Sequence, residues 1–420
     1  MNRTRGHFFA LALPLVLVLA SCIPPSAPPT FKLGLVAPFS AREAALGYNM
    51  LFAAKLAVKE WNERGGVAGH YVELVAQDDR DEAEMGALQA RKLALDLQVI
   101  GVIGHPAAVS ARAAVPVYRQ AGLPVLLVGP LLEEKELGGP PVFLLGPTAK
   151  ELSQEVARFV FPAGRRPLIR LALIEEEASS GLAEDGPLVA ALATAATALS
   201  GDVRPEVVFK AKLQRGTFGA GESREAAGRT DEGVGPIHDS PLPAAPLDQA
   251  ALLQAMVEVR PDLVYFDGRS VEGGTLLAGL RSKGLAPVFL GGPGLASPDF
   301  LKVAGQAAEG AYYVSPAPSP ADVPAARAFI EAFRAAAGTD PWPQALTVYD
   351  GINVMLTALD RSVSAGERPG RQALRSGLAQ GQHDGLVGPI AFGGRGSQVG
   401  AGAYIYRIEG MAWPGRLVGN

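Results

Sequence analysis

Residues 98–110, QVIGVIGHPAAVS, decide the fold class. The branched apolar run from Val99 to Ile103 predicts a buried strand, and the pattern from Ser110 to Gln120 predicts a helix. Gly104 and His105 predict a tight turn between them. Open α/β sheets bind ligands at such junctions, at the carboxyl ends of their strands. We expect this turn to form one wall of a binding cleft, although a purely structural turn has the same pattern.

Outward from this stretch, short apolar runs alternate with helical patterns. Expected strands of a first unit are 32–38, 71–76, 99–103, 125–128 and 142–145, and those of a second are 168–174, 206–213, 263–266, 288–290 and 311–314. This alternation predicts parallel βαβ units with right-handed crossovers, in two similar α/β units. Helices at 325–337, 345–362 and near 372–379, and strand-like runs at 389–392 and 403–408, are expected to follow.

Composition limits the class of protein. The chain has 420 residues, of which 48% are hydrophobic and 19% charged, so it can build two globular domains. Its net charge of −4 gives no basic surface for nucleic acid. Cys22 is the single cysteine, and the five histidines show no metal-ligand spacing, so we expect neither a metal site nor a cofactor.

The N-terminus has the pattern of an export signal. Arg3 and Arg5 precede an apolar run from Phe8 to Ala20, which is short for a membrane span but typical of a signal peptide. The run ends in Leu-Ala-Ser-Cys at 19–22, which resembles the lipobox of bacterial lipoproteins. We therefore expect a signal peptide at 1–21, lipidation of Cys22 and a proline-rich tether at 22–30. An ordinary secretory signal with a coincidental cysteine is the alternative.

A long segment interrupts the second unit. Residues 214–246 are rich in glycine, proline and charge and poor in apolar side chains. This composition predicts a flexible surface insertion.

Several stretches together resemble the periplasmic solute-binding proteins of the branched-chain amino acid (Leu/Ile/Val-binding) type, the receptors of ABC importers. They are AAKLAVKEWNERGGVAGHYVELVAQDD (53–79), VIGVIGHPAAVSARAAVPVYRQAGLPVLL (99–127), RPDLVYFDG (260–268), GLRSKGLAPVFLGG (from 279), VYDGINVMLTALDRSV (348–363) and LVGPIAFGGRGSQVGAGAYIYRI (386–408). The resemblance covers the chain from Phe31 to about Gly410.

The resemblance implies a type I periplasmic binding fold: two Rossmann-like α/β lobes of flavodoxin strand order, joined by three crossings near Pro147, Pro316 and Gly400. Lobe 1 would comprise 31–147 plus 317–399, and lobe 2 would comprise 148–316 plus 400–420. A small molecule would bind between the lobes, which would close by a hinge motion. The expected partners are this ligand, an ABC permease and, through the lipid on Cys22, the outer surface of a membrane.

The same resemblance places candidate ligand-binding residues. At the turn after the third strand they are His105, Ala107 and Ala108, where amino acid receptors use a serine and backbone amides. The remaining positions follow other strands or the first loop, and they are Leu46, Gly129, Leu131, Ser179, Arg269 and Pro293. His105 is interpreted first as a turn residue, and Arg269 equally as a solvated residue at the cleft edge. Ser110 is expected to cap its helix.

These residues depart from an amino acid site. Ala108 lacks the hydroxyl, and Pro293 stands where the family has the glutamate that pairs with the ligand ammonium. A buried ammonium without a carboxylate costs several kcal/mol, roughly. We therefore expect ordinary α-amino acids to bind weakly. An apolar ligand, or an anionic one held by helix-end amides and Arg269, fits better.

Other functions find less support. The acidic run at Asp78–Glu82 is expected to be a solvated turn, and 393–402, GGRGSQVGAG, a hairpin rather than a phosphate loop. No nucleophile motif such as G-x-S-x-G is present, so we expect a binding protein and not an enzyme. A sensing or partner-binding lipoprotein of the same fold, uncoupled from transport, is the alternative.

Overall fold

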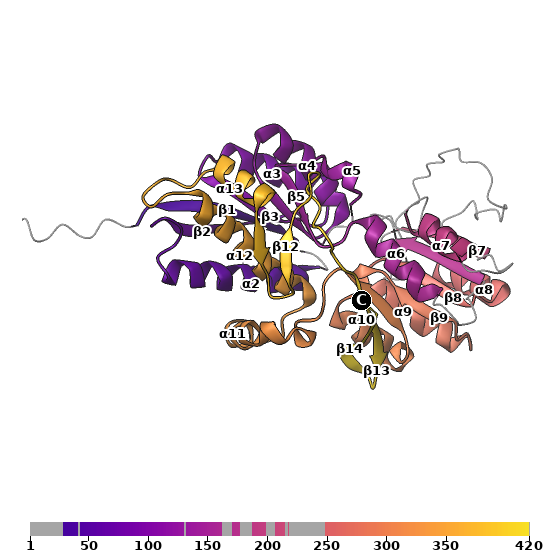
Figure 1. Ribbon diagram of the computed structural model, residues 1–420. Coiled ribbons are helices and arrows are strands. Elements are labelled where there is room, and N and C mark those ends of the chain that lie inside the picture. Colours follow the sequence, from indigo (N-terminus) through magenta and orange to yellow (C-terminus); the bar gives the residue numbers. More distant parts are fainter. Residues whose placement is uncertain are drawn as a thin grey trace, which may run out of the picture.

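The computed structural model describes residues 28–40, 43–129, 132–161, 170–176, 187–198, 206–214, 217 and 248–419. They form two α/β lobes that lie next to each other along the long axis of the molecule (Figure 1). The expected cysteine anchor and almost all of the expected insertion at 214–246 lie outside the described residues.

The first lobe is built on a parallel five-stranded sheet in the order β2-β1-β3-β4-β5. Its strands are β1 (Thr30–Ala37), β2 (Tyr71–Asp78), β3 (Val99–Gly104), β4 (Val125–Val128) and β5 (Val142–Leu145). Its helices are α2 (Ala44–Glu63), α3 (Ala83–Leu95), α4 (Ala108–Ala121), α5 (Glu134–Leu137), α11 (Arg327–Ala337), α12 (Pro343–Ser362) and α13 (Arg371–Gln380). The central strand β3 is buried along its whole length, as its apolar run predicts.

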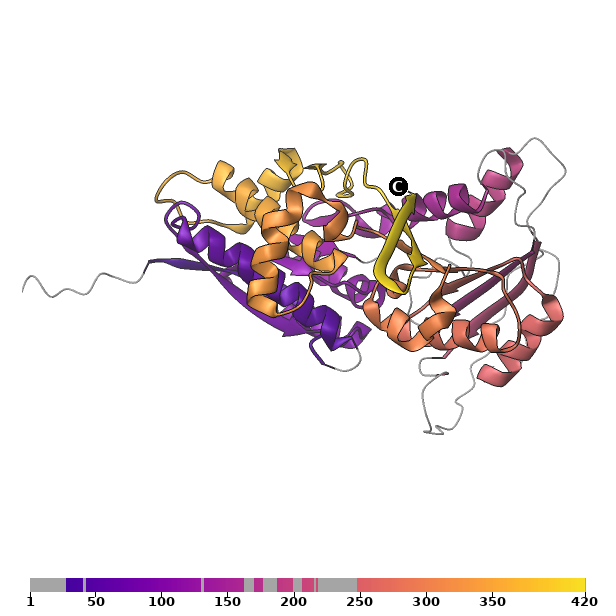
Figure 2. The same ribbon diagram turned by 90° about the horizontal axis from the view of Figure 1, so that it is seen from below.

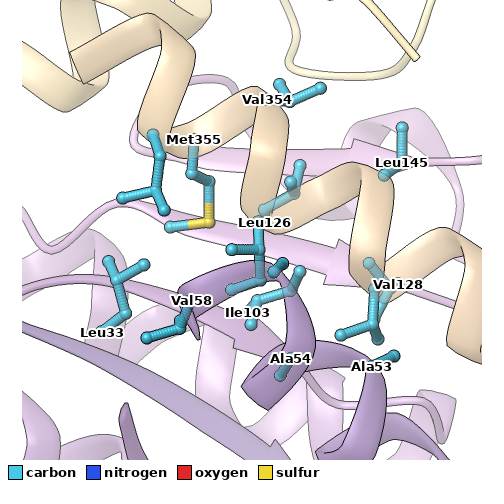
Figure 3. Packing of buried hydrophobic residues seen from close by; sticks show 14 of the residues in the cluster. Leu33, Ala53, Ala54, Val58, Ile103, Leu126, Val128, Leu145, Val354 and Met355 are labelled. Atoms are coloured by element: carbon cyan, nitrogen blue, oxygen red, sulfur yellow. The ribbon is translucent and has the colours of Figure 1, made fainter. Parts of the chain in front are cut away.

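Helices from distant parts of the sequence cover one face of this sheet. Figure 3 shows Met355 of α12 close to Leu33, Ile103 and Leu126 of the sheet, with Ala54 of α2 on the same side. All five side chains are buried. Part of this face would stay exposed without α12, so the late helices are part of the core of the first lobe. Helices α3 and α4 pack on the opposite face.

The second lobe repeats this plan and extends it. Its sheet has the order β14-β13-β10-β9-β8-β6-β7, in which β7-β6-β8-β9-β10 is again the flavodoxin order. Its strands are β6 (Arg170–Glu176), β7 (Glu206–Leu213), β8 (Leu263–Asp267), β9 (Val288–Gly291), β10 (Tyr312–Ser315), β13 (Tyr404–Glu409) and β14 (Ala412–Gly419). Its helices are α6 (Ala149–Val160), α7 (Pro187–Ala198), α8 (Gln249–Val259), α9 (Ser270–Ser282) and α10 (Pro298–Ala304).

The chain passes between the lobes three times. It crosses between β5 and α6, between β10 and α11, and between the small hairpin of β11 (Gln382–Asp384) and β12 (Pro389–Ala391) and strand β13. Strand β13 then pairs antiparallel with β10, so the end of the chain returns to the second lobe. In Figure 2 the yellow hairpin of β13 and β14 lies at the edge of the second lobe nearest the first. The expected two-lobed α/β fold is confirmed.

Candidate functional site

The turn after β3 is fixed by backbone geometry. Gly104 has a φ of 138°, and a Cβ there would lie 2.0 Å from the carbonyl oxygen of Val36 in β1. Only glycine fits this close approach. The next residue, His105, has a φ of 54° and donates its backbone N–H to the same carbonyl at 2.9 Å. The turn is therefore held rigidly against the neighbouring strand.

The side chain of His105 points into the first lobe. Its imidazole is fully buried, with Nδ1 3.1 Å from Asp79 Oδ2 and Nε2 2.8 Å from the Tyr118 hydroxyl. Because the carboxylate only accepts, Nδ1–H donates to Asp79 and Nε2 accepts from the Tyr118 hydroxyl in the neutral ring. Burial raises the pKa of Tyr118 well above its ordinary value, so the phenol keeps its proton. Both ring nitrogens have protein partners, so His105 has a structural role in the turn and no ring nitrogen is available to a ligand.

Ser110 and Asp79 belong to the same buried group, which corrects two expectations. The Ser110 hydroxyl donates to Asp79 Oδ2 at 2.6 Å instead of capping α4, whose N-cap is Ala107. Asp79 is fully buried, so the acidic run is not solvated throughout as expected. The Asp79 carboxylate accepts hydrogen bonds from the turn after β3, from α4 and from its own turn, and these contacts satisfy its charge.

Backbone and small side chains follow His105 in this turn. Ala107 is extended and Ala108 is the first residue of α4, so the helix begins at this point with its unpaired, partly positive amides. The turn after β4 lies beside it, because a Cβ on Gly129 would lie 3.6 Å from Pro106. Ala107, Ala108 and Gly129 therefore come together, as their shared position at the strand ends predicts.

In the second lobe the Arg269 side chain is engaged by carboxylates of its own lobe. Its guanidinium forms a bidentate pair with Glu176, with Nε 2.9 Å from Oε1, and it also donates to Glu272 Oε1 at 2.9 Å. The backbone N–H of Arg269 donates to Glu176 Oε2 at 3.0 Å. Both glutamate side chains are 3% exposed and that of Arg269 is 21% exposed. One cation is thus shared by two buried carboxylates, and an anionic ligand would not find Arg269 unpaired.

Pro293 lies beside Arg269, Glu176 and Glu272, which we call the second-lobe ion cluster. It opens the 3-10 turn η1 (Pro293–Leu295), and Ser270 of α9 donates its hydroxyl to the Gly294 carbonyl at 2.7 Å. A Cβ on Gly294 would lie 2.2 Å from the Gly268 carbonyl oxygen. The fold therefore brings Arg269 and Pro293 together at the strand ends of the second lobe.

A carboxyl of the first lobe approaches this ion cluster. Glu43 is the N-cap residue of α2, one turn before Leu46. Burial raises the pKa of Glu43; the positive charge of Arg269 lowers it, and the negative charges of Glu272 and Glu176 raise it further. The first turn of α2 therefore faces the second-lobe ion cluster, and Leu46 packs just behind it on the core of the first lobe.

Two candidate residues, Leu131 and Ser179, lie outside the described residues. Sequence reasoning missed Glu43, Glu176 and Glu272. Two sequence signals pointed to Glu176 and Glu272. An acidic run ends β6, and Arg269 and Glu272 are three residues apart, which is about one helical turn. The approach of Glu43 depends on the lobe arrangement and has no local signal.

Within the described ranges, no group of three histidine, cysteine, aspartate or glutamate side chains is arranged to hold a metal ion. Nor does any helix there combine the length and apolar character of a membrane span.

Known proteins resemble this chain over nearly its whole length. The leucine-specific-binding protein of Salmonella typhimurium is 25% identical over 386 residues, covering 91% of this chain and 92% of the relative. The Leu/Ile/Val-binding protein of Escherichia coli K12 is 24% identical over 387 residues, again covering 91% and 92%.

Solved structures share the fold. A leucine-binding protein from Thermotoga maritima has a TM-score of 0.71 at 18% identity, covering 93% of this chain and 98% of its own. A solute-binding protein of an ABC transporter from R. palustris, in complex with benzoate, also has a TM-score of 0.71 at 19% identity, covering 93% and 95%. Both likenesses confirm the type I periplasmic binding fold.

The family model for periplasmic binding proteins matches residues 30–412, which include both lobes and all three crossings. Proteins of this kind bind solutes and are not enzymes, in agreement with the expectation from the sequence. The chain belongs to the periplasmic binding protein family.

Proposed function

We propose that this protein is the lipid-anchored solute receptor of an ABC importer. The family supports a solute-binding role outside the cytoplasm, and the curated relatives are binding proteins for leucine, isoleucine and valine. The sequence around Cys22 supports the anchor. The solute occupies the space between the lobes, near Leu46, Ala107, Ala108, Gly129, Leu131, Ser179, Arg269 and Pro293, and the permease receives it from the closed form.

We further propose that the solute is not a standard α-amino acid. The observation that carries this proposal is that the hydroxyl nearest to Ala108, that of Ser110, and the guanidinium of Arg269 are both engaged by carboxylates of the protein. Ser110 donates to buried Asp79, and Arg269 is paired with Glu176 and Glu272. Because Ala108 stands in place of a serine, only backbone amides of the first lobe can bind a carboxylate group of the solute. A mainly apolar solute without the paired ammonium and carboxylate suits these surroundings better, and the benzoate-bound structure is an example of this fold with a ligand that lacks an ammonium.

Titration calorimetry tests the ligand class. We expect leucine and glutamate to give no saturable heat at millimolar concentration, because weak complexes of this kind release only about 4 kcal/mol of binding free energy. A leucine-binding relative serves as the positive control under the same conditions. Micromolar binding of either amino acid would refute the proposal. Native mass spectrometry of protein purified without added ligand then identifies any solute that remains bound.

The anchor has a separate test. Cys22→Ala removes the only thiol of the chain, so the protein should move from the membrane fraction to the soluble extracytoplasmic fraction. Cys22→Ala protein that stays with the membrane would contradict lipidation, and Ser21→Ala serves as the neighbouring control.

A further inference from the structure

A cavity of about 310 Å³ lies at the hinge. Gly146 of the first crossing, Ala317 of the second and Gly400 of the third all line it. Leu145 at the end of β5, Ile390 of β12 and Tyr404 of β13 complete much of the wall. Because segments of all three crossings contribute, the shape of the cavity depends on the relative position of the two lobes.

This hinge cavity is distinct from the solute site proposed above. The turns at 105–108 and 129, Arg269 and Pro293 do not line it. It adjoins β5, at one edge of the first-lobe sheet, whereas the turns of the solute site follow the more central strands β3 and β4. A ligand in the hinge cavity would therefore leave those turns uncovered.

Asp350 supplies a carboxylate to the hinge cavity. This residue of α12 is 4% exposed, and its Oδ1 and Oδ2 accept the backbone N–H of Leu386 at 3.0 and 2.9 Å. Oδ2 also lies 3.5 Å from the Val387 nitrogen. A carboxylate accepts about four hydrogen bonds, so Asp350, which lines the cavity, has capacity for a further donor. Burial raises the pKa of Asp350 to about 6, since the amide hydrogen bonds only partly offset the loss of water.

The rest of the lining combines apolar and polar surface, of which the apolar part is somewhat larger. Leu145, Ile390, Val399 and prolines of the second crossing contribute carbon surface, and Gln398 adds an amide whose Oε1 already accepts from the Gly146 N–H. Apolar surface together with a few polar groups and one ionisable residue of shifted pKa is typical of a small-molecule site. The volume equals that of about ten molecules of liquid water, which is enough for a compact ring.

We propose that the hinge cavity binds a small alkylammonium compound, with its cationic head on Asp350 and its apolar body between the three crossings. The positive head supplies the counter-charge that the amides do not, and the body displaces water from Leu145, Ile390 and Val399. The compound is an effector rather than the transported solute. Because it touches all three crossings, it stabilises one relative position of the lobes and thereby changes the affinity for the solute. The proposal does not depend on which solute the cleft takes.

Titration calorimetry with cyclohexylammonium, and with cyclohexanol as the neutral analogue, tests this site. We expect saturable binding of the ammonium compound and binding of the alcohol weakened by about tenfold, because a hydrogen bond to a charged group contributes on this scale. Asp350→Asn should remove the preference for the ammonium compound. Asp360→Asn, on the exposed side of the same helix, should leave it unchanged.

Two further measurements locate the site. Hydrogen exchange should show protection by cyclohexylammonium at the amides of Gly146 and Leu386. Val399 lines the hinge cavity at an exposed position, so Val399→Trp should prevent cyclohexylammonium from entering it. This variant tests the site independently of whether Asp350→Asn folds. Absence of saturable binding, equal binding by Asp350→Asn or by Val399→Trp, or protection confined to other segments would each overturn the proposal.

Discussion

At the scale of single residues, Asp79 holds together the turn after β3, which the sequence indicates as a candidate ligand-binding turn. It receives the Ser110 hydroxyl and the His105 imidazole, and His105 in turn contacts Tyr118. Buried polar groups of this kind are stabilising only when all partners are present. The polar residues of the turn therefore serve the rigidity of the first lobe.

Ser110→Ala should destabilise the protein by about 2 kcal/mol, because it removes a hydrogen bond to a buried carboxylate. Urea unfolding followed by circular dichroism measures this change. Ser364→Ala, at an exposed serine, should change stability by less than about 0.5 kcal/mol. Equal effects of the two substitutions would show that the Asp79 group adds nothing to stability.

Asp350 should make stability depend on pH in an unusual direction. Its folded-state pKa of about 6 lies above the ordinary value of 3.8, so the folded protein binds the proton more tightly. The resulting stabilisation is fully present below the ordinary pKa and is lost as pH rises through the folded one, by up to about 3 kcal/mol. Unfolding free energies of wild type and Asp350→Asn across this window give the difference. A difference that is constant with pH would contradict the raised pKa.

At the scale of elements, the parallel strands were predictable from sequence, because fully buried strands are continuous apolar runs. The run at Val99–Gly104 is an example, and all six of its residues are buried. Helix α6 was missed, although its apolar residues recur every three to four positions and Thr148 and Glu151 form a capping box. Strand β14 was also missed, because it contains Pro414 and Gly415, which are uncommon within strands. Such residues are tolerated here because β14 lies at the edge of its sheet.

The capping box has a measurable consequence for the second lobe. The Glu151 N–H donates to Thr148 Oγ1 at 3.3 Å, and the Thr148 hydroxyl donates to Glu151 Oε2 at 2.8 Å. Thr148→Ala should cost about 1 kcal/mol of stability, and Thr148→Ser should restore most of it. Thermal unfolding compares the two variants. If serine is no better than alanine, the hydroxyl contacts do not stabilise α6.

At the scale of the whole molecule, the charge contacts around Arg269 were harder to predict than the fold. Ala108 and Pro293 could be placed at strand ends by resemblance, because local motifs fix those turns. The pairing of Arg269 with Glu176 joins residues 93 positions apart, and the approach of Glu43 joins two lobes. Such contacts depend on how the sheets and lobes pack, and no local periodicity encodes them.

Glu43 should oppose closure of the lobes while it is ionised. Arg269 attracts it, whereas Glu272, Glu176 and Asp299 repel it, and we expect the three anions together to outweigh the single cation. Glu43→Gln should therefore favour the closed form and give a smaller radius of gyration by small-angle X-ray scattering. Glu63→Gln, at an exposed position of the same helix, serves as the control. An unchanged or larger radius for Glu43→Gln would show that this charge does not hold the lobes apart.

The threefold crossing of the chain also dictates an order of events during synthesis and export. The sheet face that carries Leu33, Ile103 and Leu126 acquires its cover only when α12 has emerged, and β10 gains its outer neighbour only with β13. Neither lobe can complete its core until late in synthesis. The first lobe needs α12, which follows most of the second lobe in the sequence, and the second lobe needs β13, which follows α12. A nascent chain that stops after β10 would leave the part of this apolar face that α12 covers exposed to water, and the unfinished protein therefore needs shielding from its neighbours until its last crossing has formed.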